Sequence, residues 1–308
     1  MAGSNEGNEG NEGNAGNVGR SGGGYGVLAD RVDIPFITEG NIASKRLAQT
    51  KWDDRSWTGD WYAWLMLVDF ARTVDLPYVK PSGPLGATQL WVPTPAETQA
   101  TMLGTPNDNQ ELGRLVRLAE DERADALGEI VDQGRGFIGY FMAAMSISPH
   151  SHPRTCRLLF TGSLIGAYVS LHFKGLHQRR RPPQRAPALL PPIEVPGHAS
   201  YPSGHATQAR LMARCIEAAL PTTPDNIRGQ LGDVIDTLAA RIARNREIAG
   251  LHFHSDTVAG WNLADNAFTI LNGTNMPVSV PTPIPNDTTA PTTRRFAQMV
   301  SDAGGEWS

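Results

Sequence analysis

Hydrophobic positions along most of the chain recur at intervals of three and four residues, the spacing that places apolar side chains on one face of an α-helix. Patterns of this kind predict helices over residues 57–71, 110–131, 136–147, 153–176, 204–219, 224–248 and 255–271. The sequence has no convincing alternating series of the kind that marks a half-buried strand. The expected fold class is therefore all-α, a single helical-bundle domain.

The first of these predicted helices carries the clearest stripe of large side chains. Trp57, Trp61, Trp64, Leu65 and Val68 follow one another at helical spacing. Aromatic residues at such positions are most often part of a core. We therefore expect this stripe to face the interior.

The most apolar stretch of the sequence covers residues 158–173 and runs directly into Lys174. It is shorter than the roughly 20 residues that cross a bilayer as a helix. The mean hydropathy of the whole chain is −0.30. We therefore expect a buried core helix and no integral membrane span.

Composition divides the chain into four parts. Residues 1–24 hold an Asn-Glu-Gly repeat and a glycine run, which favours a disordered tail over a binding element, and residues 25–56 show no regular pattern. The helical catalytic domain is expected over 57–272, followed by a Pro- and Thr-rich extension over 273–308, expected to be irregular. The N-terminus has neither the basic nor the apolar part of a secretory signal, so a cytoplasmic or otherwise leaderless protein is expected.

Charge and cysteine content exclude several classes of function. Lys and Arg number 27 and Asp and Glu 31, giving a net charge of −4, so no general attraction to nucleic acid is expected. The two cysteines, Cys156 and Cys215, lie in apolar helical contexts without C-x-x-C spacing. They are predicted to be small core residues, with a disulfide or a reactive thiol as the less favoured alternative.

Polar residues with chemical potential concentrate in three short motifs between residues 174 and 256. The motifs are K-x6-R-P (Lys174, Arg181, Pro182), P-S-G-H (Pro202, Ser203, Gly204, His205) and R-x5-H-x3-D (Arg246, His252, Asp256). Together they supply cations, backbone donors, an acid, a nucleophile and a group that orients it. These are the parts that phosphoryl transfer through a covalent intermediate requires.

The first motif supplies two cations that can point into one pocket. Arg181 offers a planar fork for two oxygens and Lys174 a mobile point charge, a combination suited to the oxygens of a phosphate. Taken alone the motif indicates a solvated basic face, because Arg179, Arg180 and Arg185 lie nearby. Only the other two motifs favour an oxyanion site.

The second motif predicts a tight loop that enters a helix. Ser203 is a good N-cap residue, and the free N–H groups of the following helix would favour an anion. Gly204 lets the backbone approach closely, and His205 is placed to protonate a leaving group. Taken alone, this motif also fits an ordinary turn before a helix.

The third motif supplies Arg246 as a further oxygen clamp, His252 as the nucleophile and Asp256 as the carboxylate that fixes its tautomer. An ordinary structural His–Asp pair at a helix start is the alternative. A metal site formed by His252, His254 and Asp256 would need an extended segment, which the helical pattern from residue 255 onward disfavours.

The three motifs resemble those of the superfamily that joins type 2 phosphatidic acid phosphatases, bacterial nonspecific acid phosphatases and vanadium-dependent haloperoxidases. The resemblance covers about residues 141–271 and implies an all-helical bundle with the site at its core. It implies that Lys174, Arg181, Ser203, Gly204 and Arg246 hold the oxyanion, that His205 is the acid, that His252 is the covalent ligand and that Asp256 orients it. One position departs from the pattern, since Asn245 stands where serine usually precedes the arginine.

Two branches of this superfamily are indicated. The stretch H-F-H-S-D-T-V-A-G from His252 is similar to phosphatases, whereas the stretch H-A-S-Y-P-S-G-H-A-T-Q from His198 resembles bromoperoxidases, in which a histidine at this position lies beside the cofactor. We expect a metal-independent phosphatase without a cofactor, acting on a small phosphorylated substrate through a phosphohistidine. The alternatives are a vanadium-dependent haloperoxidase, with vanadate on His252 and His198 on the halide side, and a noncatalytic anion-binding protein. The sequence carries no signal of oligomeric state.

Overall fold

The computed structural model describes residues 57–223, 226–273 and 292–307. The tail predicted over 1–24 and the irregular segment predicted over 25–56 lie outside the described residues.

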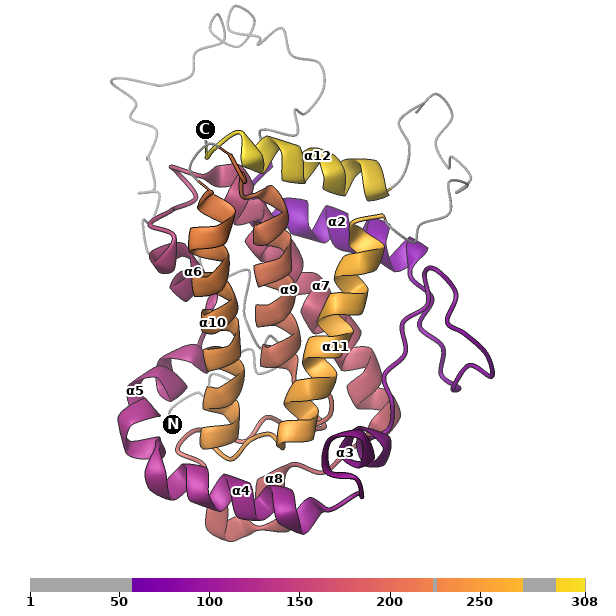
Figure 1. Cartoon of the computed structure of the whole chain (residues 1–308), viewed down its shortest axis with the longest axis vertical. Coiled ribbons are helices and arrows are strands. Elements are labelled where there is room, and N and C mark those ends of the chain that lie inside the picture. Colours follow the sequence, from indigo (N-terminus) through magenta and orange to yellow (C-terminus); the bar gives the residue numbers. More distant parts are fainter. Residues whose placement is uncertain (1–56, 224–225, 274–291, 308) are drawn as a thin grey trace, which may run out of the picture.

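The described part of the chain is helical, which confirms the predicted all-α class (Figure 1). The helices are α2 (Gly59–Thr73), α3 (Pro95–Leu103), α4 (Asp108–Asp121), α5 (Arg123–Gln133), α6 (Ile138–Ala144), α7 (Pro153–His177), α8 (Pro182–Arg185), the 3-10 turn η2 (Pro187–Leu189), α9 (Gly204–Ala219), α10 (Ile227–Ile248), α11 (His254–Leu271) and α12 (Thr292–Gly304). No strand occurs within the described ranges, where an isolated bridge joins Asp75 to Gln89.

Four long helices, α7, α9, α10 and α11, form the centre of the molecule (Figure 1). Two glycines let α7 and α9 pack antiparallel at backbone contact. A Cβ on Gly162 would lie 2.9 Å from Met212 Cα, and a Cβ on Gly166 would lie 2.8 Å from Gln208 Cα. Helices α2 and α12 cross the upper end of the bundle, and α3, α4 and α8 close the lower end. The hydrophobic core therefore lies between the long helices and under α2 and α12.

Helix α7 is the described helix that is long and apolar enough for a membrane span, counted together with the residues up to Arg185. In its most apolar window 83% of the residues are buried inside the fold. This is the burial expected of a core helix, as the sequence predicted for residues 158–173.

The prediction for the α2 stripe is wrong about the face that is buried. Trp61 is 61% exposed and Trp64 is 52% exposed, and Val68 is exposed as well. The buried face instead carries Tyr62, Ala63, Met66 and Phe70, which pack on α7. Both stripes have helical spacing. The guanidinium of Arg157 on the Tyr62 ring and the close contact of Gly59 with the Phe160 ring show which one meets α7.

The prediction of an irregular C-terminal segment is wrong for residues 292–304. They form α12, which buries Phe296, Met299 and Ala303 in the main core. Glu306 then accepts hydrogen bonds from the main-chain N–H groups of Arg154 and Thr155 at 2.9 and 2.8 Å. The domain therefore extends past residue 272, because this segment packs on α7, α9 and α2.

Other helix boundaries agree with the sequence to different degrees. The helix predicted over 204–219 is found with the same bounds, and Ser203 caps it by accepting from Ala206 N at 3.4 Å. The helix predicted over 110–131 is divided at Glu122 into α4 and α5. Helix α3 was not predicted, although Thr94 and Glu97 form a capping box at its start.

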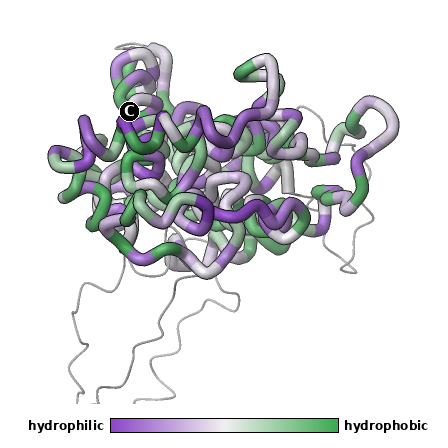
Figure 2. The backbone as a smooth tube through the Cα atoms, turned by 90° about the horizontal axis from the view of Figure 1, so that it is seen from below, coloured by the Kyte–Doolittle hydropathy of each residue, from purple (hydrophilic) through white to green (hydrophobic). Residues whose placement is uncertain are grey.

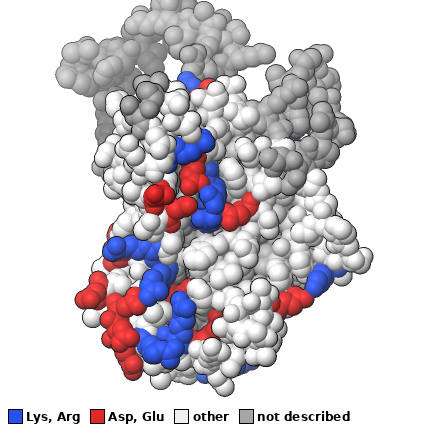
Figure 3. All heavy atoms as spheres, viewed as in Figure 1, with Lys and Arg blue, Asp and Glu red and all other residues white. Residues whose placement is uncertain are grey.

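Hydrophobic and hydrophilic positions mix along the helical segments (Figure 2), as expected of amphipathic helices around a shared core. On the face of Figure 3, basic and acidic side chains lie next to one another. Two ion pairs, Arg241–Glu129 and Arg244–Glu122, tie α10 to the α4–α5 region.

Candidate active site

The residues of the three motifs lie at the lower end of the bundle, where α7 and α10 end and α9 and α11 begin. Helix α7 ends at His177, and Gln178 caps it in the left-handed conformation. Arg181 is the N-cap of the short helix α8 and precedes Pro182. The helix thus ends before the proline, so Arg181 can turn inward to 1% exposure.

His252 and Asp256 form a buried pair just before and within the first turn of α11. His252 Nδ1 lies 3.2 Å from Asp256 Oδ2, and the two side chains are 1% and 0% exposed. His252 Nε2 lies 3.3 Å from Arg181 Nη1. Because a guanidinium can only donate, Nε2 accepts this hydrogen bond and the imidazole proton lies on Nδ1, facing the carboxylate. The lone pair of Nε2 therefore points toward the Arg181 guanidinium.

The electrostatics of the site keep His252 neutral. Burial, and then the positive charge of Arg181, lower its pKa to about 3, although the hydrogen bond with Asp256 acts in the opposite direction. The charge of Lys174 lowers the pKa further. A neutral imidazole with one unprotonated ring nitrogen is the form that can attack phosphorus or bind a metal oxyanion.

Asp256 is held as a carboxylate by four donors. Its Oδ1 accepts from Arg179 Nη1 at 2.6 Å, and its Oδ2 accepts from Phe253 N at 3.0 Å, from the hydroxyl of Ser200 and from His252. Burial by itself would raise the pKa of this carboxyl, but the charge of Arg179 and the hydrogen bonds from His252 and Ser200 hold the pKa well below its usual range. An ionised, fully hydrogen-bonded carboxylate suits the role of orienting His252.

Arg181 connects His252 to His198. Its Nη1 donates to Leu251 O at 3.2 Å, its Nε donates to His198 O at 3.0 Å, and its Nη2 lies 3.1 Å from His198 Nδ1. His198, the predicted halide-side residue, is therefore adjacent to the arginine that contacts His252.

Lys174 lies at the same end of the bundle and is 2% exposed. Its Nζ donates to Ala199 O at 2.8 Å and to Ser200 O at 3.2 Å. The ammonium therefore sits beneath the loop that leads from His198 into the second motif.

The second motif enters α9 as predicted. Ser203 N donates to Asp256 O at 2.9 Å, so the start of α9 is bonded to the start of α11. A Cβ on Gly260 would lie 2.8 Å from Ser203 O, which shows how closely the two helices approach. Gly204 is the first residue of α9. Its N–H belongs to the set that a helix leaves unbonded at its N-terminus.

His205 is buried and faces the last turn of α5. Its Nε2 donates to Gln133 O at 3.2 Å, and its ring lies on Phe137 with centroids 4.9 Å apart. Arg246 reaches the same turn, where its Nη2 donates to Ile130 O at 2.8 Å. His205 and Arg246 are therefore joined through α5.

Asn245 stands where the similar motif usually has serine, and the structure shows its contacts. Asn245 donates to Gln133 Oε1 and to Glu129 Oε2, both at 2.9 Å. Gln133 is the residue whose carbonyl accepts from His205. Asn245 thus supports the α5 turn that contacts His205 and Arg246.

The predicted residues fall into two groups. In the first, hydrogen bonds link His198, Arg181, His252 and Asp256, and Lys174 reaches this group through the carbonyl oxygens of Ala199 and Ser200. In the second, His205 and Arg246 each donate to a carbonyl oxygen of α5. Main-chain bonds join the groups: Leu251 N donates to Arg246 O at 3.0 Å, and Ser203 N donates to Asp256 O. Segments up to 82 positions apart in the sequence (174 to 256) thus meet at one end of the fold.

Three residues at this site were not predicted from the sequence. The sequence pattern indicates only a basic stretch for Arg179. In the structure its guanidinium donates to Asp256, Ser255, Asp108 and Glu111 and lies on the Phe253 ring. The second is Glu111, which is buried and accepts from Ser255 N and Oγ. The third is Ser200, two positions before the second motif, whose hydroxyl donates to Asp256 Oδ2. Spacing along the chain carries no signal for Arg179 or Glu111, because their partners lie on other segments.

His254 does not join His252 and Asp256 as a ligand set. Its Nδ1 lies 2.9 Å from Glu247 Oε1, away from the His252–Asp256 pair. Among the described residues, no group of three or more His, Cys, Asp or Glu side chains is arranged to hold a metal ion. The H-x-H-x-D spacing therefore does not produce a metal-like cluster here.

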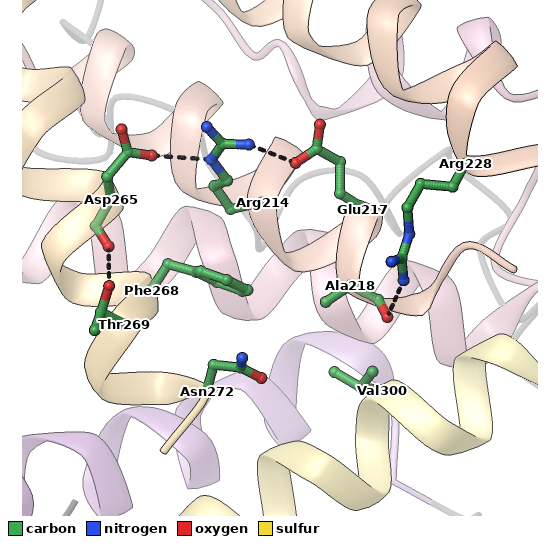
Figure 4. A pocket seen from close by; sticks show the side chains of 9 residues that line it. All are labelled: Arg214, Glu217, Ala218, Arg228, Asp265, Phe268, Thr269, Asn272 and Val300. Carbon is green, nitrogen blue, oxygen red and sulfur yellow. Dashed lines mark hydrogen bonds and ion pairs between the residues drawn. The ribbon is translucent and has the colours of Figure 1, made fainter. Parts of the chain in front are cut away.

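Two pockets lie in different parts of the molecule. One, of about 610 Å³, adjoins the site and is lined by residues on both sides of Arg181, including Arg180, Gln184 and His198. The other, of about 620 Å³, lies toward the far ends of α9 and α11 (Figure 4). There Arg214 is paired with Asp265 and Glu217, and none of the predicted site residues lines it.

No protein-family model matches this sequence, and no curated protein matches it. The functional assignment accordingly depends on the motifs and on the geometry of the site.

Proposed function

We propose that this chain is a phosphatase that hydrolyses small phosphate monoesters through a phosphohistidine at His252. The observation that carries the proposal is the state of this imidazole. It is buried and neutral, its Nδ1–H faces the Asp256 carboxylate, and its Nε2 faces the Arg181 guanidinium. A phosphate bound by Arg181 would bring phosphorus close to that lone pair.

In the first step His252 Nε2 attacks phosphorus and the bond from phosphorus to the ester oxygen breaks. Arg181, Lys174 and Arg246 stabilise the charge on the phosphoryl oxygens, together with the N–H groups at the start of α9. His205, protonated on both ring nitrogens in this step, gives its Nε2 proton to the departing alkoxide and becomes a neutral imidazole, so the leaving group is a neutral alcohol. That proton is now held by Gln133 O, so the ester oxygen must replace this carbonyl as its acceptor.

In the second step water attacks the phosphohistidine. His205, now without its proton, takes a proton from the water, and the P–N bond breaks to release inorganic phosphate and neutral His252. Asp256 stays ionised throughout and stabilises the positive charge that the imidazole carries while phosphorylated. The cycle needs no further reactant.

A second function is supported by the position of His198 beside Arg181. In this alternative the chain is a vanadium-dependent haloperoxidase. The same cations and α9 N–H groups fit vanadate, a tetrahedral oxyanion, with His252 Nε2 as its ligand. Bound vanadate would supply the activation of hydrogen peroxide for halide oxidation. His198 and Arg181 would donate hydrogen bonds on that side.

Side-by-side assays of phosphate release and of peroxide-dependent bromide oxidation, each with and without vanadate, test both functions. The phosphatase is expected to release phosphate from p-nitrophenyl phosphate and to be inhibited competitively by vanadate. Bromide oxidation that appears only with vanadate, in the absence of ester hydrolysis, would select the alternative. Phosphate binding without either activity would leave a noncatalytic anion-binding protein.

Substitution of the nucleophile tests the covalent step. His252→Ala is expected to abolish turnover. Rapid quenching with base should trap an acid-labile phosphoryl group on the wild-type enzyme, and the variant should not form this group. His254→Ala is the matched control, because His254 lies two positions away and bonds Glu247. Undiminished hydrolysis by His252→Ala would falsify the assignment.

A further inference from the structure

Polar side chains, among them those of Arg180, Gln184 and Gln178, line the pocket of about 610 Å³ beside the site. Arg180 is exposed, and no ion pair of its side chain occurs among the described residues. Gln184 Oε1 accepts from Arg181 N at 2.8 Å, which leaves its NH₂ group available. Gln178 contributes a third polar side chain to the lining. A pocket of this size fits a small molecule.

The backbone at the edge of this pocket is held in an uncommon conformation. Gln178 has φ 47° and ψ 35°, the left-handed region that glycine favours. A non-glycine residue there costs on the order of 1 kcal/mol, and such residues concentrate at functional sites. The conformation ends α7 and sets the direction of the segment that carries Arg179, Arg180 and Arg181.

Two neighbouring arginines in this segment lie in different surroundings, one buried and one exposed. Arg181 has extended backbone angles and is 1% exposed, in contact with His252. Arg180 is exposed and lines the pocket. Successive side chains of an extended segment point to opposite sides. His198 lines the same pocket and contacts Arg181, so it lies between the two environments.

The cations that line the pocket at the other end of the bundle differ from Arg180 (Figure 4). Its cations already have partners: Arg214 is paired with Asp265 and Glu217, and Arg228 donates to Ala218 O and Leu220 O. Thr269 donates to Asp265 O. Of these two pockets, the one beside the site has a cation, Arg180, that forms no ion pair with any described residue.

We propose that the pocket lined by Arg180, Gln184 and His198 binds the nonreacting part of the substrate, and that Arg180 pairs with a second anionic group on it. This inference rests on the proposed function. The substrate class is then small hydrophilic phosphate esters that carry a further carboxylate or phosphate, with hydroxyl groups facing the two glutamine side chains. Arg180 acts as a specificity-determining residue.

Three esters with one six-carbon skeleton test this assignment. Sorbitol 6-phosphate has a hydroxymethyl group at the far end, 6-phosphogluconate has a carboxylate there, and sorbitol 1,6-bisphosphate has a second phosphate. We expect kcat/KM for phosphate release to favour one or both doubly charged esters by roughly two- to fivefold, the effect of an ion pair with an exposed arginine. The preference should shrink as ionic strength rises.

Arg180→Gln is expected to remove this preference. Arg117→Gln is the matched control, because Arg117 is an exposed arginine on α4 outside the pocket, and this variant should keep the preference. Equal kcat/KM for all three esters in the wild-type protein would overturn the proposal, as would a preference that survives in Arg180→Gln.

Calorimetric Kd values for the same esters separate this proposal from the phosphatase proposal. Binding that favours a doubly charged ester and depends on Arg180, without any phosphate release, would overturn the hydrolytic function and retain the pocket. Turnover of all three esters with equal Kd values would overturn the pocket proposal and retain the hydrolytic function.

Discussion

Arg179 Nη1 donates to Asp256 Oδ1 at 2.6 Å, and it does so across 77 positions of sequence. The same guanidinium bonds Asp108 and Glu111 through Nη2. With a side chain only 8% exposed, Arg179 neutralises the carboxylate that orients His252. Asp256 is thus held in place by Arg179, which lies two positions before Arg181 of the first motif.

Replacing Arg179 by glutamine should change the ionisation of Asp256 as well as stability. Without the guanidinium charge, burial dominates and the pKa of Asp256 rises, so the acid limb of the kcat/KM profile should move to higher pH. We expect a roughly 10- to 100-fold loss of kcat and a loss of about 3 kcal/mol in the free energy of unfolding. Arg179→Lys should restore part of the pH profile. If Arg179→Gln lowered stability but left the acid limb of the kcat/KM profile unchanged, Arg179 would have a structural role only.

The depressed pKa of His252 predicts a specific pH dependence of stability. Its ordinary pKa is 6.5 and its folded value is about 3, so between these values the unfolded chain binds a proton that the folded chain does not. The free energy of unfolding should therefore fall as pH drops from 6.5, and His252 should contribute about 1.4 kcal/mol per pH unit.

Urea unfolding of wild type and His252→Gln between pH 4.5 and 7.5 measures this contribution. The variant should show the shallower decline toward acid. The window stays above the ordinary pKa of Asp256, 3.8, whose stabilising contribution is lost only at lower pH. Parallel curves for the two proteins would contradict a buried neutral imidazole.

Glu306 is predicted to stabilise the start of α7 from the far end of the chain. It accepts from Arg154 N, Thr155 N and Thr155 Oγ1 at 2.8 to 2.9 Å, as a capping carboxylate does. Glu306→Ala should lower the free energy of unfolding by about 1–2 kcal/mol with unchanged kcat. Asp302→Ala, which removes the half-exposed pair with Arg154, should cost less than about 1 kcal/mol. A reversed order of the two losses in a thermal melt would contradict the capping role.

Two glycines of α7 predict opposite effects of the same substitution. At Gly166 a Cβ would lie 2.8 Å from the backbone of Gln208, so Gly166→Ala should destabilise by about 1–3 kcal/mol. At Gly175 a Cβ meets nothing within 4 Å, so Gly175→Ala should be neutral or stabilise by up to about 1 kcal/mol. Equal thermal shifts for the two variants would mean that α7 and α9 separate easily.

Much of the helical framework could be predicted from the sequence, but less of its packing. The bounds of α9 followed from Ser203 and the apolar spacing behind it. Which face of α2 is buried did not, because the tryptophan stripe and the Tyr62–Met66–Phe70 stripe have the same period. Contacts with α7, a distant segment, select between them.

Helix α12 shows a signal that could have been used. Phe296, Met299 and Ala303 recur at helical spacing, but the Pro- and Thr-rich residues before them directed the interpretation toward irregular chain. For the site, motif spacing pointed to His252, Asp256 and Arg181, which do lie in contact. It could not identify Glu111, because a buried carboxylate on α4 gains its meaning only from Ser255 and Arg179.

The glycine contacts between α7 and α9 also bear on precision at the site. Lys174 lies two turns beyond Gly166 on one helix, and His205 lies about one turn before Gln208 on the other. Because the backbones of α7 and α9 are in contact at these glycines, the distance between the two helices is fixed within narrow limits. A substitution that wedges them apart by a few tenths of an ångström should therefore impair turnover before it unfolds the protein.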